Sequence, residues 1–85
     1  MLPAKTEMQA RVLVTLRRGV LDPAGQAVRD SLGQLGFGEV QEVRIGKVLE
    51  VTLVDMPIEE ARRRLDEMGR KLLANTVIED FEIEL

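Results

Sequence analysis

Apolar and polar residues alternate near the start of the chain, and this period of two restricts the fold to one that begins with a β-strand. The apolar positions are Met8, Ala10, Val12, Val14 and Leu16. Because successive side chains of a strand point to opposite faces, these positions predict one buried face. The other face carries mainly polar residues, with Leu13 as the exception.

A helix is expected over residues 23–35. Asp22 precedes Pro23, a pair typical of helix starts. The carboxylate can accept from the free N–H groups of the first turn, and proline at the first helical position loses no hydrogen bond. Small and apolar side chains then recur at helical spacing, at Ala24, Ala27, Val28, Ser31, Leu32 and Leu35. Gly36 follows and can end the helix in the left-handed conformation.

Residues 39–54 are rich in strand-forming side chains and are interrupted by Gly46-Lys47. Glycine can adopt the positive φ of a tight turn, so we predict a hairpin at this point. The side chains expected to face inward are Val43, Ile45, Leu49, Val51 and Leu53. The alternative is a single long, bent strand.

A second helix is expected to open at Pro57. Its apolar positions recur every three or four residues, at Ile58, Ala61, Leu65, Met68 and Leu72. It ends near Asn75-Thr76. Residues 80–85 then alternate as a last strand, with Phe81, Ile83 and Leu85 facing inward.

This order, β-α-β-β-α-β, predicts an α+β, ferredoxin-like fold with a four-stranded antiparallel sheet and two helices on one face. With 85 residues the chain can build one core, so we expect one domain over residues 8–85 and a flexible extension over residues 1–7. The other face of the sheet is half apolar, which suits a subunit interface in a sheet-mediated dimer or tetramer. Its interface candidates are Leu13, Thr15, Val48, Thr52 and Val54.

The residue types that most catalytic and metal sites need are missing, because the chain has neither Cys nor His. Adjacent carboxylates such as Glu59 and Glu60 point apart on a helix. Three nearby glycines follow a helix, whereas a phosphate loop precedes one. We therefore expect no catalytic residue, no metal and no bound cofactor.

Composition also argues against nucleic acid and membrane as partners. The net charge is −3, and the only aromatic residues are Phe37 and Phe81, too few for the base-stacking platform of an RNA-recognition domain. No apolar run approaches the ~20 residues of a membrane span, and no secretory signal is recognisable, so a cytoplasmic location is expected. A small ferredoxin-like regulatory module that binds a ligand through backbone groups remains an alternative.

Three ordered stretches resemble the PurS family, the small subunit of phosphoribosylformylglycinamidine synthase (formylglycinamide ribonucleotide amidotransferase). The first is Val14-Thr15-Leu16 followed by Val20-Leu21-Asp22-Pro23-Ala24-Gly25-Gln26-Ala27-Val28, the second is Val43-Arg44-Ile45-Gly46-Lys47, and the third is residues 72–81. The resemblance covers about residues 8–85. Two features depart from the family pattern: the extension through Glu7, and Thr76 where proline is common.

The resemblance implies a non-catalytic accessory subunit that joins a PurQ-type glutaminase and a PurL-type synthetase in purine biosynthesis. That complex converts formylglycinamide ribonucleotide, glutamine and ATP to formylglycinamidine ribonucleotide and glutamate; ATP and Mg²⁺ would be used by the complex and not bound by this chain. Self-association and help with ammonia transfer are also implied. The expected partner contacts are exposed cations in or beside the three stretches, namely Arg17, Arg18, Arg44 and Lys47.

Overall fold

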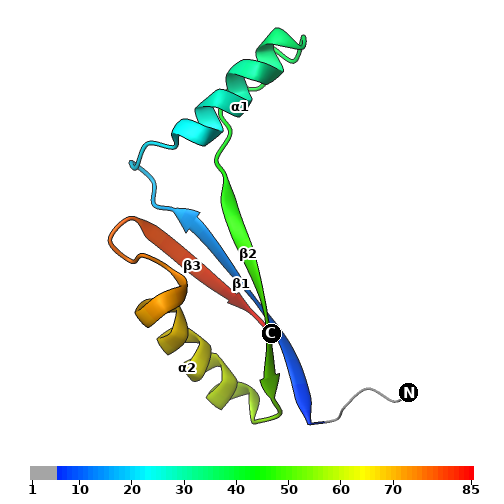
Figure 1. Cartoon of the computed structure of the whole chain (residues 1–85), viewed down its shortest axis with the longest axis vertical. Helices are drawn as coiled ribbons and strands as arrows, with labels where there is room; N and C mark the ends of the chain where they lie inside the picture. The colour runs from blue at the N-terminus through cyan, green and yellow to red at the C-terminus, as the bar shows by residue number, and fades with distance from the viewer. Residues whose placement is uncertain (1–5) are drawn as a thin grey trace, which may run out of the picture.

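The computed structural model describes residues 6–85, which form three strands, two α-helices and a π-helical turn (Figure 1). In chain order these are β1 (Glu7–Leu16), α1 (Pro23–Gln34), β2 (Gly46–Val54), α2 (Ile58–Met68), the π-helical turn η1 (Gly69–Leu73) and β3 (Glu79–Glu84). Most of the predicted N-terminal extension, residues 1–5, lies outside the described residues. No helix among residues 6–85 combines the length and apolar character needed to cross a membrane.

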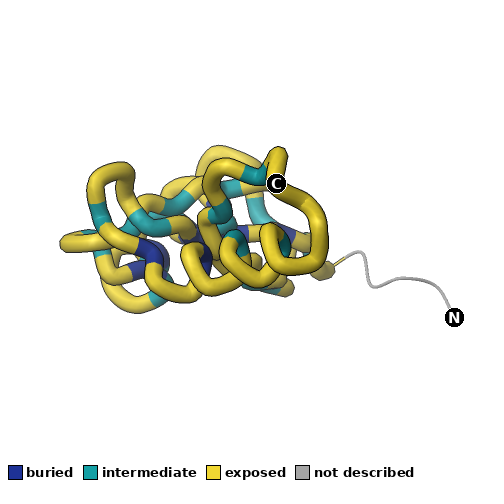
Figure 2. The backbone as a smooth tube through the Cα atoms, turned by 90° about the horizontal axis from the view of Figure 1, so that it is seen from above, coloured by how far each residue is buried: buried dark blue, intermediate teal, exposed yellow. Residues whose placement is uncertain are grey.

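The strand β1 is the centre of an antiparallel sheet with the order β2-β1-β3. The alternation predicted for β1 is confirmed, since Ala10, Val12 and Val14 are buried. They pack with Leu65 and Ala74 to form the core between the sheet and α2. Figure 2 shows how few residues are buried and how much of the chain is exposed.

The predicted fourth strand and the hairpin at Gly46-Lys47 are wrong. Residues 39–45 form no strand, and β2 runs without a break from Gly46. Gly46 lies opposite Thr15 in the ladder, and a Cβ at this position would come within 3.0 Å of the Val14 carbonyl oxygen. This glycine therefore permits the close approach of two strands and makes no turn. The alternative prediction, a single long strand, agrees better with the structure, although the observed strand begins only at Gly46.

The prediction that both helices cover one face of the sheet is also wrong. The helix α2 lies along the strands, whereas α1 projects beyond the end of the sheet (Figure 1). The radius of gyration is 17.1 Å, against about 12 Å expected for a compact chain of this length. We call α1 and the segment that returns to β2, residues 35–45, the arm. An apolar stripe shows that a helix has a face to bury, but it does not say which surface covers that face.

The π-helical turn after α2 changes which apolar side chains point inward. The Ala74 N–H donates to the Gly69 carbonyl, five residues back, at 3.0 Å. Ala61 and Leu65 are buried as predicted, but Leu72 is 83% exposed and Ala74 is buried. The extra residue in the turn shifts the helical pattern, so the predicted inward position of Leu72 is wrong.

Candidate protein-interaction site

The polar contacts that organise the described residues concentrate where the arm leaves the sheet. Elsewhere the side-chain contacts are mainly exposed ion pairs, such as Arg70 with Asp66 and Lys71 with Glu67 along α2 and its π-helical turn. Among residues 6–85, no group of three or more acidic, His or Cys side chains is placed to hold a metal ion. The base of the arm is therefore the candidate functional site. Its polar groups form a structural junction that joins the arm to the sheet.

Asp22 is the centre of this junction and is only 6% exposed. Its Oδ1 accepts a hydrogen bond from the Gly25 N–H at 2.8 Å, which caps α1 as predicted. Its Oδ2 accepts from the Ile45 N–H at 2.7 Å. These two backbone donors, Ile45 first and Gly25 second, hold the pKa of Asp22 below its ordinary value. One carboxylate thus connects the start of the helix to the segment that returns to β2.

A close backbone approach accompanies these hydrogen bonds. Gly25 is buried in the first turn of α1, and a Cβ there would lie within 3.0 Å of both the Val43 carbonyl oxygen and the Asp22 carboxylate. Sequence reasoning missed this contact. The sequence did contain a signal for it. A glycine in the first turn of a helix lowers helix stability, so its presence there indicates another role, such as a close backbone contact.

Replacing Asp22 with Asn should loosen the arm and remove a pH dependence. In the native chain the depressed pKa means that the carboxylate contributes stability above the ordinary aspartate range, and that this contribution is lost as the pH falls through the folded-state pKa. Hydrogen exchange should show α1 amides losing protection below about pH 4, before those of β1. In the Asp22→Asn variant α1 protection should be low and nearly independent of pH across the acid range; a native profile in this variant would contradict the assignment.

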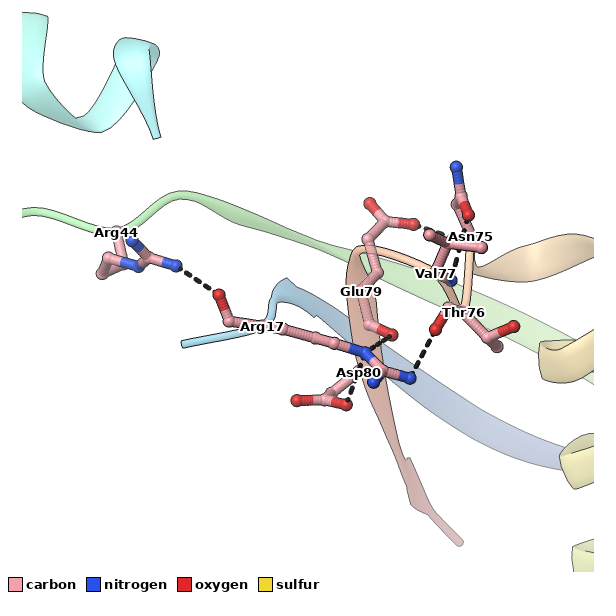
Figure 3. A network of polar contacts seen from close by, with 7 residues as sticks. All are labelled: Arg17, Arg44, Asn75, Thr76, Val77, Glu79 and Asp80. Carbon is pink, nitrogen blue, oxygen red and sulfur yellow. Dashed lines mark hydrogen bonds and ion pairs between the residues drawn. The ribbon is translucent and has the colours of Figure 1, made fainter. Parts of the chain in front are cut away.

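Two arginines extend the junction to the start of β3 (Figure 3). The guanidinium of Arg44 donates to the Val20 carbonyl at 2.9 Å and to the Arg17 carbonyl at 3.0 Å. The guanidinium of Arg17 donates to the carbonyls of Thr76 and Glu79 and lies 3.5 Å from Asp80 Oδ1. Arg44 therefore holds the arm to the end of β1, and Arg17 holds the end of β1 to the turn before β3.

Side-chain hydrogen bonds hold the turn before β3, where Thr76 stands at the position for which the resemblance predicts a proline. The Asn75 N–H donates to Glu79 Oε1 at 2.7 Å, and the Val77 N–H donates to Asn75 Oδ1 at 3.2 Å. Thr76 supplies the carbonyl that accepts from Arg17. The departure at Thr76 is thus accommodated by side-chain hydrogen bonds (Figure 3).

The four predicted partner-contact cations do not form one cluster. Arg17 and Arg44 come together, but both guanidinium groups bind carbonyls of this chain. Arg18 is exposed and lines a shallow hollow with Arg44, Glu42 and Asp80. Lys47 is exposed on β2. A partner-contact role for the four remains a prediction, and Arg18 and Lys47 are the two whose side chains are free for it in the described part of the chain.

The five predicted interface residues do share one face of the sheet, opposite the core, which we call the open face. Leu13 pairs with Val48, Thr15 with Gly46, and Thr52 with Gln9, whose Oε1 accepts from the threonine hydroxyl at 3.1 Å. Val54, at the end of the same row, is 72% exposed. Their placement on the open face is as predicted; their role in an interface remains a prediction.

The arm presents a second apolar surface that the sequence did not place. Its exposed apolar side chains include Leu35 at 73% exposure and, less exposed, Val28 and Phe37; Leu21 lies exposed at its base. A 12-residue helix with two glycines is marginal in water by itself, so an exposed apolar surface on it is expected to meet another protein.

Comparisons with known proteins point to one family. The PurS family model, described as phosphoribosylformylglycinamidine (FGAM) synthase, matches residues 9–85. The synthase subunit PurS of Synechocystis is 52% identical over 75 residues, which cover 88% of this chain and 75% of that protein.

Solved structures show the same fold. Methanocaldococcus jannaschii PurS, described as one of the subunits of formylglycinamide ribonucleotide amidotransferase in the purine biosynthetic pathway, superposes with a TM-score of 0.80 at 38% identity, covering 89% of this chain and 92% of that one. A chain in the Thermotoga maritima PurLQS structure gives a TM-score of 0.83 at 24% identity, covering 92% and 95%. At that identity the second likeness concerns the fold alone.

Proposed function

This chain belongs to the PurS family, and from that membership we propose that it acts as the accessory subunit of phosphoribosylformylglycinamidine synthase in purine biosynthesis. The observation that carries the proposal is the family match over residues 9–85, almost the whole described chain. The complex would convert formylglycinamide ribonucleotide and glutamine to formylglycinamidine ribonucleotide and glutamate with consumption of ATP.

In this proposal the chain contributes no catalytic group. ATP and Mg²⁺ would bind to the synthetase subunit. The contribution of the chain is positional, and the proposed location is the cytoplasm, where purine synthesis would take place.

We propose that the arm contacts a PurL-type synthetase and a PurQ-type glutaminase. Its exposed apolar side chains supply the contact area, and Arg18 in the connection before it and Lys47 just after its end supply charge. Membership of the PurS family, described as phosphoribosylformylglycinamidine (FGAM) synthase, supports this choice of partners. By holding two active sites in one complex, the subunit would limit the loss to water of ammonia released from glutamine.

The open face is proposed as a surface for self-association. Leu13 and Val48 are cross-strand neighbours near its centre, and Thr15, Thr52 and Val54 extend the row along the two strands. Leu13 and Val48 would form a small apolar centre, and the charged Arg11 and Glu50, paired beside them on the same face, would form part of a polar rim.

Replacing Leu35 with Glu tests the role of the arm in assembly. Leu35 is 73% exposed, so the fold should survive, but a carboxylate in a buried apolar contact should weaken assembly about tenfold or more. We expect glutamine-dependent activity of the complex, reconstituted with limiting amounts of this subunit, to fall by that factor. Activity of the synthetase with ammonium ions as nitrogen source should not change.

The matched control is Leu72→Glu, which makes the same change at a leucine that is also largely exposed and lies away from the arm. Its glutamine-dependent activity should stay at the native level. Native activity in the Leu35→Glu complex would show that the arm does not meet the larger subunits, and an equal loss in both variants would show a general effect of the added charge.

A further inference from the structure

The arm is held together by its own contacts. At its base, Asp22 accepts hydrogen bonds from the first turn of α1 at 2.8 Å and from the Ile45 N–H at 2.7 Å. At its far end, the Phe37 N–H donates to the Leu32 carbonyl at 2.9 Å, which closes the turn between α1 and the returning segment. A motion that keeps these hydrogen bonds therefore moves the helix and the returning segment as one body.

Few contacts fix the direction of the arm relative to the sheet. Within the described residues, α1 makes no extensive contact with a strand or with α2, and it projects beyond the end of the sheet (Figure 1). None of the ion pairs among residues 6–85 joins the arm to the sheet. In the same part of the chain, the side-chain hydrogen bonds between the arm and the residues before Asp22 all come from Arg44. The direction of the arm thus depends on this side chain and on the two connections to the sheet, residues 17–22 and 45–46.

Arg44 binds both ends of a β-turn in the first of these connections. The Val20 N–H donates to the Arg17 carbonyl at 3.1 Å, and Gly19 has a φ of +92°, as the third residue of a type II turn requires. The Arg44 guanidinium donates to the Val20 carbonyl at 2.9 Å and to the Arg17 carbonyl at 3.0 Å, and Figure 3 shows the second of these bonds. One side chain of the arm therefore bridges the first and the last residue of the turn that leads into the arm.

From these contacts we infer that Arg44 is a positioning residue, which fixes the direction in which the arm leaves the sheet. We call its two hydrogen bonds to the turn the latch. The planar guanidinium presents its N–H groups at fixed angles, so the latch sets the orientation of the arm as well as its distance from the turn. Because Arg44 is exposed, water competes for the same groups, and the latch opens and closes while the arm stays folded.

The latch and a charged contact with a partner make different demands on this residue. A contact through charge needs only a cation, so lysine would serve as well as arginine. Simultaneous hydrogen bonds to the carbonyls of Arg17 and Val20 need the forked group of arginine, whereas lysine carries a single ammonium on a flexible chain. Replacing Arg44 with Lys therefore separates the two roles.

This inference goes beyond the proposed function, because it concerns the free chain and does not depend on which protein the arm meets. The two ideas also fail separately. Loss of the latch would appear in the distance between the arm and α2 in the purified chain, whereas loss of the accessory role would appear in glutamine-dependent activity of the complex.

Spin labels on the arm and on α2 test the latch, since the chain has no cysteine of its own. Gln34→Cys and Glu59→Cys place the labels at two exposed positions, one at the end of α1 and one in the first turn of α2. Double electron–electron resonance on labelled chains diluted into unlabelled chains measures the distance within one molecule. We expect one narrow distance distribution when Arg44 is present. Arg44→Gln and Arg44→Lys should both lose the narrow peak and give a broad distribution.

Hydrogen exchange on the two Arg44 variants checks that the arm moves as one body. The hydrogen bonds within the arm do not involve the Arg44 guanidinium, so α1 amides should keep their native protection in both variants. This result would differ from that of Asp22→Asn, which breaks the base of the arm. Lost α1 protection in the Arg44 variants would show that the arm unfolds, and would overturn the inference.

Two variants of the turn complete the test. Arg18→Gln removes the exposed neighbouring arginine and should keep the narrow distribution. Gly19→Val places a β-branched side chain where φ is positive, which disfavours the turn, and should broaden the distribution although Arg44 is intact. The opposite result in either variant would contradict the role of the turn. A narrow distribution in Arg44→Gln would overturn the latch, and so would recovery in Arg44→Lys, because charge alone would then suffice.

Discussion

Replacing Leu65 with Ala should lower the free energy of unfolding by about 2–5 kcal/mol, the range for deleting a buried leucine side chain from a packed core. Leu65, on α2, is fully buried in the cluster that contains Ala10, Val12 and Val14 of β1. With a core this small, neighbouring side chains cannot close the cavity completely. Urea unfolding followed by circular dichroism, at one fixed protein concentration because self-association would add stability, measures the change.

Leu72→Ala is the matched control for this experiment. Leu72 lies in the π-helical turn that follows α2 and is 83% exposed, so the same deletion should change stability by no more than about 0.5 kcal/mol. Equal losses at the two leucines would show that the helical pattern continues to Leu72 and that the turn does not displace it. A large effect at Leu72 alone would reverse the assignment of the inner and outer faces.

Replacing Gly25 with Ala should displace the arm, with a cost of about 1–3 kcal/mol of the kind seen when a packed site receives an extra methyl group. The added Cβ would overlap the Val43 carbonyl oxygen, and a backbone atom cannot move aside by changing rotamer. The first turn of α1 would have to separate from the returning segment, which breaks the hydrogen bonds of Asp22. We expect α1 amides to lose hydrogen-exchange protection while β1 amides keep theirs.

Gly33→Ala provides the comparison within the same helix. No atom lies within 4 Å of a Cβ at this position, so the substitution should be neutral or should stabilise the chain by about 0.4–1 kcal/mol. The proposed accessory role adds a second readout, since only Gly25→Ala should lower glutamine-dependent activity of the reconstituted complex. Equal effects of Gly25→Ala and Gly33→Ala on α1 hydrogen exchange would contradict the close contact between α1 and the returning segment.

The elements that follow from local stereochemistry were predictable. The alternation over residues 8–16 identified β1 and its buried face, and Asp22-Pro23 with Gly36 delimited α1 to within a residue or two. Each of these signals depends on neighbours within a few positions along the chain. Half of the candidate site was predictable in the same way, because the capping role of Asp22 is a local contact. Its hydrogen bond to Ile45 was not, because it joins residues 23 positions apart.

Gly46 and Leu72 show where such reasoning failed. A glycine beside a polar residue predicts a turn, but the same glycine also suits a strand that passes close to its neighbour, and only the pairing with β1 distinguishes the two. Likewise, the predicted helical spacing holds up to Met68, and the π-helical turn that follows displaces Leu72 from the inward face. Gly69, the first residue of this turn, lies close to the Phe81 ring.

The amino-acid sequence by itself determined that this chain has one buried strand face, a capped helix and a charged second helix, and no cysteine or histidine for chemistry. Only the tertiary structure decided that three strands form the sheet, that α1 leaves it as an arm, and that Arg17 and Arg44 bind carbonyls of their own chain. The reason is physical: backbone conformation responds to adjacent residues, whereas burial and hydrogen-bond partners depend on segments that meet only after the chain has folded.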